Sequence, residues 1–357
     1  MHVEDLDTPA LLIDLDIMER NLERMATYAR SHNLRLRPHT KTHKIPELGR
    51  RQLQLGAFGL TVAKVSEAEV MVKAEPPELL IAFPVIGRQK LARLMKLAGN
   101  LALTVSLDSE TAAAQLSEAA SAAGVTIGVL AEIDAGLGRV GVQPGPDLVA
   151  LAKAIERLPG LRFDGIAFYP GHIRSASAPL EALSEVVAGA VTDLEVAGFE
   201  VRLVSGGSTP TLLNSHRVAR LNEIRPGTYI FNDRNTVECG AVEWTDCAAS
   251  IMVTVVSTAV KGQMIVDGGS KTFSSDRTAG SGAPSFGRVV EAPHAVFEKM
   301  NEEHGFIAVP NGFRVGDRVK IIPNHICVAM NLHEQVYGLR GDQVETVWKV
   351  EGRGKLQ

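Results

Sequence analysis

Short runs of apolar and β-branched residues alternate with longer amphipathic stretches along the first two thirds of the chain. The stretches between the runs carry helix-start signals, such as Ser66 followed three residues later by Glu69. Eight strand–helix repeats over about 220 residues are typical of a (β/α)8 barrel, which is the α/β fold that we predict. The alternative is one doubly wound sheet with a β tail. The eight runs lie at 34–40, 56–63, 78–85, 101–108, 126–135, 163–172, 200–207 and 224–233.

The pattern changes after residue 240. Strand-like runs follow one another with Gly-Asp turns and little helical spacing between them, which predicts a mostly antiparallel β domain. The run at 10–15 is also strand-like and precedes the barrel. We therefore assign residues 16–240 to the barrel, and residues 1–15 and 241–357 to the β domain.

Composition excludes several classes of protein. Lys and Arg number 37 against 41 Asp and Glu, so no overall basic field indicates nucleic-acid binding. No apolar run is long enough to span a bilayer, and the acidic start does not resemble a signal peptide. The 3 cysteines are too few for a disulfide framework. We expect a soluble, cytoplasmic protein with no membrane and no nucleic-acid partner.

The stretch RPHTKTHK, residues 37–44, concentrates unusual chemistry in a predicted strand. As a strand it places Arg37, His39, Lys41 and His43 on one face. Barrel chemistry lies at the C-terminal ends of the strands, and this stretch ends the first one. A lysine there is either an ordinary surface residue or a catalytic group.

Other polar residues fall at the ends of later strands. The fifth strand is followed by Asp134 and Arg139, and the sixth by Tyr169 and His172. Loops after the seventh and eighth strands often bind phosphate in barrels, because small residues expose backbone N–H groups. A phosphate site and a lysine in one barrel mouth indicate pyridoxal 5'-phosphate held as a Schiff base. The candidate cofactor-binding residues in these loops are Ser205, Gly206, Gly207, Ser208, Thr209, Gly227, Thr228 and Tyr229.

Several motifs together resemble the D-threonine aldolase and D-serine dehydratase family of alanine-racemase-like pyridoxal-phosphate enzymes. They are DTPALLIDLD, RPHTKTHK, GLTVAKVSEAEVM, SGGSTPT, RPGTYIFND and PNHICVAMNL, and the resemblance runs from residue 7 to near residue 350. It implies a Schiff-base lysine matching Lys41, a divalent metal beside the cofactor, and a homodimer.

The resemblance matches the metal ligands of the family to His325 and Cys327. In a strand, His-x-Cys places both side chains on one face, as a metal site requires. A core histidine beside a buried free thiol would give the same local pattern. A thiolate ligand favours Zn2+, whereas the His-x-Asp of the metal-activated aldolases suits Mn2+ or Mg2+.

The resemblance also implies a lyase that acts on β-hydroxy-D-amino acids. In the aldolase reaction a base removes the β-hydroxyl proton, and the products are glycine and an aldehyde. His172, His39 and a metal-bound water are the candidate bases. Arg139 would lie near the cofactor or the substrate carboxylate, and Tyr169 near the ring. Arg139 could equally be an arginine on a helix face, and Tyr169 could equally be a tyrosine packed in the core.

Two other activities stay open. A dehydratase would give an α-keto acid and ammonia, with Lys41 removing the α-proton, and its family members carry His-x-Cys at this place. A racemase would use the same lysine without a metal. The segments after residue 330 and at 301–305 resemble the aldolases, so we predict a D-threonine-type aldolase. The substrate side chain is not specified by any motif.

Overall fold

The structure is a computed structural model that describes residues 1–278, 285–309 and 312–357. The chain forms two compact units. The barrel unit consists of residues 25–41, 46–227 and 355–357, and the β unit of residues 1–24, 42–45 and 228–354. The chain therefore passes from the barrel unit to the β unit after Lys41 and again after Gly227.

The barrel unit contains a sheet of eight parallel strands among the described residues, in the order β2-β9-β8-β7-β6-β5-β4-β3. Each of the eight runs expected from the sequence overlaps one of these strands. Their bounds are β2 Arg35–Leu36, β3 Leu60–Val62, β4 Glu78–Ile81, β5 Ala102–Leu107, β6 Ile127–Glu132, β7 Leu161–Ala167, β8 Leu203–Gly206 and β9 Glu223–Ile224.

Backbone hydrogen bonds join the two ends of this sheet. The amide of Phe58 donates to the carbonyl of Leu36 at 2.8 Å, and the amide of Thr61 donates to the carbonyl of Pro38 at 2.8 Å. The segments at β2 and β3 are thus linked, and the sheet closes on itself. The predicted (β/α)8 barrel followed by a mostly antiparallel sheet is confirmed.

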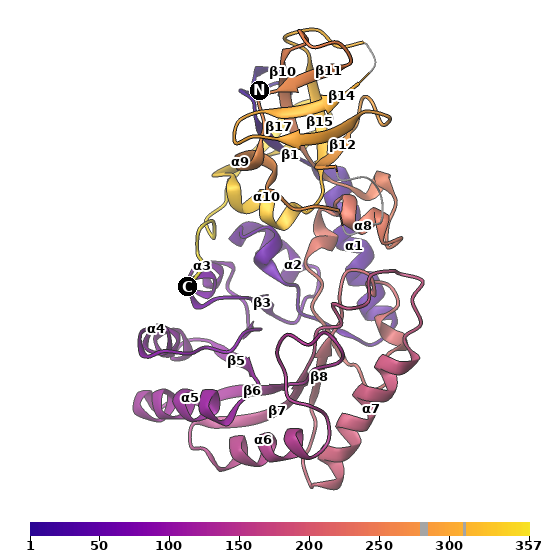
Figure 1. The fold of residues 1–357 in the computed structure, drawn as a ribbon. Helices are drawn as coiled ribbons and strands as arrows, with labels where there is room; N and C mark the ends of the chain where they lie inside the picture. Colours follow the sequence, from indigo (N-terminus) through magenta and orange to yellow (C-terminus); the bar gives the residue numbers. More distant parts are fainter. Residues whose placement is uncertain (279–284, 310–311) are drawn as a thin grey trace. The chain divides into compact units, whose positions relative to one another are not determined.

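Helices follow the barrel strands and lie outside them (Figure 1). In α5, the Ser109 hydroxyl accepts a hydrogen bond from the Ala112 amide, and Gly124 ends the helix in the left-handed conformation. Leu116 is buried on the inner face of this helix. The helices are α1 Leu15–Ser31, which extends into both units, and α2 Pro46–Gln54, α3 Val65–Met71, α4 Arg88–Ala98, α5 Glu110–Ala123, α6 Pro146–Arg157 and α7 Glu181–Val196.

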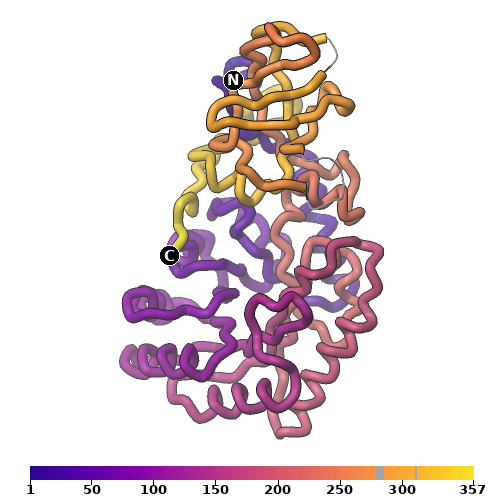
Figure 2. Tube along the Cα trace, viewed as in Figure 1, coloured from indigo at the N-terminus to yellow at the C-terminus, as the bar shows by residue number. Residues whose placement is uncertain are grey.

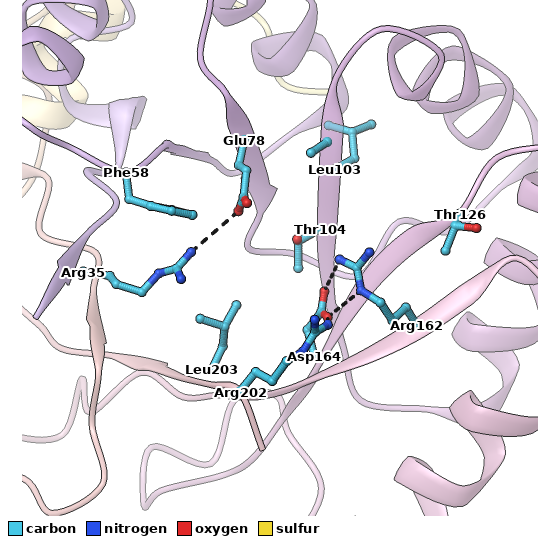
Figure 3. A pocket seen from close by; sticks show the side chains of 11 residues that line it. Arg35, Phe58, Glu78, Leu103, Thr104, Thr126, Arg162, Asp164, Arg202 and Leu203 are labelled. Atoms are coloured by element: carbon cyan, nitrogen blue, oxygen red, sulfur yellow. Dashed lines mark hydrogen bonds and ion pairs between the residues drawn. The ribbon is translucent and has the colours of Figure 1, made fainter. Parts of the chain in front are cut away.

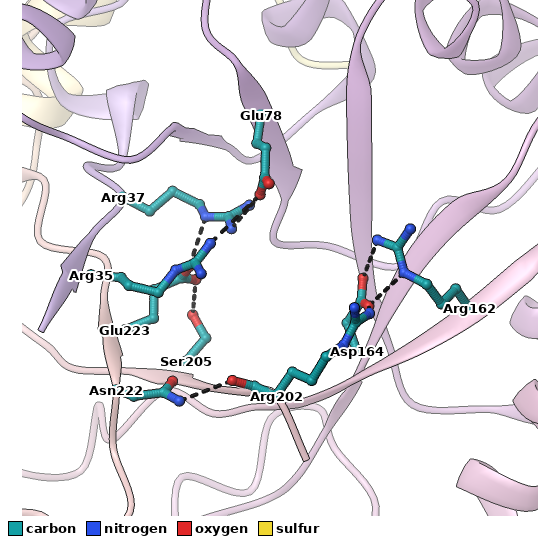
Figure 4. A network of polar contacts seen from close by, with 9 residues as sticks. All are labelled: Arg35, Arg37, Glu78, Arg162, Asp164, Arg202, Ser205, Asn222 and Glu223. Carbon is teal, nitrogen blue, oxygen red and sulfur yellow. Dashed lines mark hydrogen bonds and ion pairs between the residues drawn. The ribbon is translucent and has the colours of Figure 1, made fainter. Parts of the chain in front are cut away.

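A network of charged residues crosses the barrel interior (Figure 4). Arg37 is fully buried, and its guanidinium donates to Glu223 at 2.9 Å and to Glu78 at 3.0 Å. Glu223 also accepts a hydrogen bond from the Ser205 hydroxyl at 2.6 Å. Buried charges are tolerated only when they are paired and hydrogen-bonded. The network therefore fixes β2, β4, β8 and β9 against one another.

The β unit contains a nine-stranded, mostly antiparallel sheet among the described residues. In Figure 2 the indigo N-terminal segment runs among the orange and yellow C-terminal strands. This segment is β1, which pairs antiparallel with β10 and parallel with β16. The bounds are β1 Ala10–Asp14, β10 Ala249–Ser257, β11 Gln263–Val266, β12 Gly287–Val289, β13 Val296–Met300, β14 Gly305–Ala308, β15 Arg318–Pro323, β16 Gln335–Arg340 and β17 Gln343–Lys349; three short helices are α8 Arg234–Glu238, α9 Ser270–Phe273 and α10 Ile326–Leu332.

The prediction of a strand through residues 37–44 is wrong. β2 ends at Leu36, and Thr40–Thr42 form a 3-10 helix. Bonds to both neighbouring segments continue as far as His39, whose amide donates to the carbonyl of Pro226, and the chain then turns into the 3-10 helix. The four side chains expected on one face are consequently separated: Arg37 and His43 are buried, whereas Lys41 is exposed.

None of the helices in the described parts of the chain combines the length and the apolar composition needed to cross a membrane.

The buried network yields a prediction on stability. Replacing Arg37 by Leu leaves the Glu223 carboxylate buried without its guanidinium partner, and we expect a loss of about 3–5 kcal/mol in the free energy of unfolding. Urea titration monitored by circular dichroism measures this loss. Arg157→Leu, an exposed change at the end of α6, is the matched control and should shift stability by less than about 0.5 kcal/mol. Equal stability of the two variants would contradict the prediction.

Candidate active site

The candidate residues of the barrel unit lie after the C-terminal ends of its strands. His39 and Lys41 follow β2, Arg139 follows β6, Tyr169 and His172 follow β7, and Gly207, Ser208 and Thr209 follow β8. Gly227 follows β9. Ser205 and Gly206 are the last two residues of β8 itself, and Thr228, Tyr229, His325 and Cys327 belong to the β unit.

Lys41 projects from a short turn with a well-fixed backbone. The His39 amide donates to the carbonyl of Pro226 at 2.9 Å, and the Thr40 hydroxyl donates to the carbonyl of Thr61 at 3.1 Å. The Lys41 amide donates to Nδ1 of His39 at 3.4 Å. The neighbours of Lys41 are therefore anchored to the closed barrel, while the lysine itself is exposed.

His43 plays a different part from His39. It is fully buried, and its Nδ1 accepts a hydrogen bond from the amide of Ile45 at 3.1 Å. This bond lies within the segment 42–45, which belongs to the β unit. His43 thus fixes its own stretch of chain.

The loop after β8 requires its two glycines. A Cβ atom at Gly206 would lie 2.3 Å from the ring of Phe168, and Gly207 has a φ of +94° that disfavours other residues. After them, the Ser208 amide donates to the Thr211 hydroxyl at 3.0 Å. Ser208 is buried, so this loop is packed tightly against the barrel end. The hydroxyl of Ser205 is directed to Glu223 within the barrel network.

A second glycine-rich loop follows β6. The Asp134 carboxylate accepts hydrogen bonds from the amides of Gly136 and Gly138, each at 3.0 Å. These backbone donors, that of Gly138 above all, lower the pKa of Asp134. Asp134 therefore shapes the loop. A Cβ at Gly136 would lie 3.1 Å from the His172 ring, so the glycine lets the loop approach this imidazole.

Arg139 and Tyr169 lie together in the barrel unit. The guanidinium of Arg139 lies over the Tyr169 ring, 5.0 Å from its centroid. This is a cation–π distance, at which the aromatic face attracts the positive charge. The stacking holds the two side chains in one cluster at the ends of neighbouring strands.

His325 and Cys327 lie at the start of a helix. β15 ends at Pro323, His325 is the N-cap residue of α10, and Cys327 is the second residue of that helix. The expected strand through this motif is therefore wrong. The negative charge of a Cys327 thiolate, and a hydrogen bond to it, raise the pKa of His325.

Asp233 orients the His325 ring. Nδ1 of His325 lies 3.0 Å from a carboxylate oxygen of Asp233, and the same oxygen accepts the amide of Ile326 at 3.1 Å. The Asp233 carboxylate adds to the raised pKa of His325. A carboxylate on Nδ1 fixes the ring and leaves Nε2 as the nitrogen for another partner, as the carboxylate partners of metal-bound histidines do.

Two hydroxyls lie against the sulfur of Cys327. Its Sγ is 3.1 Å from the hydroxyl of Thr42 and 3.7 Å from that of Thr228. Both threonines are the first residues of the β unit after a passage of the chain from the barrel unit.

The donor set fits a divalent metal with open positions. An oriented imidazole and a thiol supply one nitrogen and one sulfur ligand, a combination suited to Zn2+. Among residues 1–278, 285–309 and 312–357, no group of three or more His, Cys, Asp or Glu side chains could hold a metal. A metal on His325 and Cys327 would take its other ligands from water or substrate.

Several residues of these networks were not predicted. Asp233 is the last residue of the run predicted as the eighth strand. Its carboxylate accepts hydrogen bonds from the first turns of α8 and α10, and the spacing of apolar residues does not predict these contacts. Arg225 is half-buried, and desolvation lowers its pKa; it donates to Ser205 and to the carbonyl of Phe168. Glu223 lies in the same segment and is buried. The sequence signal that could have indicated Glu223 and Arg225 is the presence of charged residues beside an apolar, strand-like run.

Comparison with known proteins identifies the family. The family described as alanine racemase, N-terminal domain, matches residues 13–235, and a putative serine dehydratase domain matches residues 248–339. A D-threonine aldolase from Arthrobacter is 34% identical, over 98% of this chain and 93% of that protein.

Two solved structures are similar over nearly the whole chain. The D-threonine aldolase from Filomicrobium marinum has a TM-score of 0.93 and 36% identity, over 99% of this chain and 97% of that one. A cysteine-to-alanine mutant of D-threo-3-hydroxyaspartate dehydratase, described as metal-free, has a TM-score of 0.88 and 30% identity, over 98% of each chain. The family resemblance found in the sequence is confirmed: this chain belongs to the alanine-racemase-like family that contains D-threonine aldolases and D-threo-3-hydroxyaspartate dehydratases, and it is a lyase.

Proposed function

We propose that this lyase is a pyridoxal-phosphate- and metal-dependent aldolase that cleaves β-hydroxy-D-amino acids of the D-threonine type to glycine and an aldehyde. Lys41 would hold the cofactor, and His325 with Cys327 would hold the metal. When bound, the cofactor withdraws electrons from the bonds at the substrate Cα, and the metal lowers the pKa of a bound hydroxyl. The D-threonine aldolase relatives support this assignment.

One observation carries the proposal. Thr42 contacts the sulfur of Cys327, and Lys41 is the residue bonded to Thr42. Consecutive Cα atoms are about 3.8 Å apart, so a single peptide unit separates the candidate cofactor lysine from a residue touching a candidate metal ligand. A substrate that engages both groups needs them within one small site. The covalent bond between Lys41 and Thr42 favours such a closeness of the two groups.

The other residues have supporting roles in the proposal. The loops with Gly207, Ser208 and Gly227 would hold the cofactor phosphate, since small residues at strand ends expose N–H donors. The remaining proposed cofactor contacts are Gly206, Thr209, Thr228, Tyr229 and the stacked pair of Arg139 and Tyr169. His172 and His39 are the candidates for taking the β-hydroxyl proton.

The Cys327 thiol favours a second activity. D-threo-3-hydroxyaspartate dehydratase has a solved structure in which a cysteine is replaced by alanine and the protein is metal-free. If that cysteine corresponds to Cys327, the thiol is compatible with elimination of the β-hydroxyl. In that reaction Lys41 would take the α-proton, and the products would be an α-keto acid and ammonia.

The lysine assignment predicts the site of a covalent label. Borohydride reduction of the holoenzyme should attach the pyridoxyl group to Lys41, because its exposed amine lies at the candidate cofactor loops of the barrel. Peptide mapping by mass spectrometry locates the label. Lys41→Ala should lose the label and turnover. Lys64→Ala is the control, since Lys64 stacks on Phe83 at 3.6 Å and should leave the label in place. A label on Lys44 or Lys64 would refute the assignment.

The metal assignment predicts a change in metal content. Cys327→Ala should lower the bound metal, measured by elemental analysis of the purified protein, by at least about tenfold. Chelator treatment should remove activity, and Mn2+, Zn2+ or Mg2+ should restore it. Cys239→Ala is the matched control, because Cys239 is another free cysteine of the β unit. Unchanged metal content in Cys327→Ala would exclude this ligand pair.

The aldolase assignment predicts the products. The holoenzyme with a divalent metal should convert D-threonine to equal amounts of glycine and acetaldehyde. Parallel assays of aldehyde and α-keto acid on D-threonine, D-serine and a 3-hydroxy-D-aspartate measure the partition. Keto acid and ammonia without glycine would establish the dehydratase. Interconversion of simple amino-acid enantiomers, with no reaction of any β-hydroxy substrate, would exclude both.

A further inference from the structure

The barrel has a polar cavity at the N-terminal ends of its strands (Figure 3). Its volume is about 210 Å³, which is the volume that roughly seven molecules occupy in liquid water. It is lined by the residues that open or precede successive strands, among them Arg35 of β2, Glu78 of β4, Thr126 before β6 and Arg202 before β8. The candidate catalytic residues follow the opposite, C-terminal ends. This cavity is therefore separate from them.

One side of the cavity carries an excess of positive charge. The Asp164 carboxylate is almost completely buried and accepts two hydrogen bonds from Arg162, at 2.7 and 2.9 Å. Arg202 makes a second ion pair with the same carboxylate (Figure 4). Two guanidinium groups thus share one carboxylate. Both arginines are half exposed and keep further N–H donors at the cavity.

The other side of the cavity holds a poorly paired arginine. Arg35 lies 3.9 Å from Glu78 and 3.8 Å from Glu223, whereas Arg37 takes the short bonds to both carboxylates. Nε of Arg35 is buried and has no hydrogen-bond partner among the described residues. The Arg35 guanidinium lies over the ring of Phe58, 3.3 Å from its centroid. Stacking fixes this group without satisfying its donors.

The charges of the two sides do not balance. The charged residues that line the cavity are three arginines, Arg35, Arg162 and Arg202, and two acidic residues, Glu78 and Asp164. One positive charge remains, on the side of Asp164. The hydroxyls of Thr104 and Thr126 also border the space.

We propose that this N-terminal cavity binds a small oxyanion, a carboxylate or a phosphate, between Arg162 and Arg202 with Arg35 as a further donor. Guanidinium forks match the oxygens of these anions in pairs, and the excess charge favours an anion over a neutral ligand. Gly128 keeps the space open, since a Cβ there would lie within bonding range of Asp164 and 2.9 Å from the Thr104 hydroxyl. The site does not depend on the proposed catalytic function.

The test uses the holoenzyme, so that the cofactor already occupies its own phosphate loop. Melting temperature is followed while inorganic phosphate, or in a second series succinate, is added against sodium chloride of matched ionic strength. We expect a saturable rise with at least one of the two anions and none with chloride. The anion that acts identifies phosphate or carboxylate as the ligand chemistry.

Arg202→Gln is the diagnostic variant. Asp164 retains both bonds from Arg162, so the variant should fold. Loss of a charged donor should raise the apparent Kd for the anion by at least about tenfold. Arg202→Lys keeps the positive charge but not the paired donors of the guanidinium. Its apparent Kd should lie between those of the parent and of Arg202→Gln. Arg157→Gln removes an equal charge from exposed helix α6 and should bind as the parent does.

Two results would overturn the proposal. The first is a melting temperature that follows ionic strength alone for phosphate and succinate. The second is a saturable rise that is equal in the parent and in Arg202→Gln, since the anion would then bind elsewhere, for instance where the substrate does. Isothermal titration of the parent and of Arg202→Gln measures the Kd directly and decides between these results where the thermal shift is small.

Discussion

The buried ion pair between Arg37 and Glu223 is the constraint on which the barrel depends. Desolvating these two groups is expensive, and the cost is offset only while the Arg37 guanidinium meets Glu223 and Glu78 at hydrogen-bond distance. That condition holds only if β2, β4 and β9 keep one register. Arg37 lies at the point of closure, because its carbonyl also accepts the Thr61 hydroxyl at 2.8 Å. The same side chain therefore stabilises the interior and positions the seam.

The end of the barrel that carries the candidate catalytic residues inherits its geometry from that seam. The chain leaves Arg37, is bonded at Pro38 and His39 to residues of the neighbouring strands, and reaches Lys41 within four residues. A lysine on a long loop would sample many positions, whereas anchored neighbours restrict the Lys41 backbone. The exposed amine is thus presented by a rigid support, which is the usual arrangement for a functional group on a barrel.

Periodicity was enough to predict the barrel but not the polar contacts within it. Apolar runs mark buried parallel strands wherever they occur, so all eight strands were found, although β2 and β9 have only two residues each. The alternation expected through RPHTKTHK failed because the chain leaves the sheet after His39 and forms a 3-10 helix over Thr40–Thr42. His-x-Cys was assigned to a strand, yet Asp233, distant in sequence, caps the helix there. Contacts between residues that are distant in sequence produce no local spacing pattern, so they could not be predicted from periodicity.

The residues that open two segments of the β unit lie against one sulfur atom. Thr42 and Thr228 each begin a β-unit segment, and each contacts the sulfur of Cys327. The peptide that carries Lys41 is thereby tied to a candidate metal ligand through a neighbouring residue, whichever reaction follows. Carbon–carbon cleavage and loss of hydroxide then differ in which substrate proton a base removes. In cleavage it is the proton of the β-hydroxyl, and in loss of hydroxide it is the proton on the α-carbon. The contacts of Thr42 and Thr228 with the Cys327 sulfur are common to both proposed reactions, and in the proposal the difference lies with single side chains such as His172 and His39.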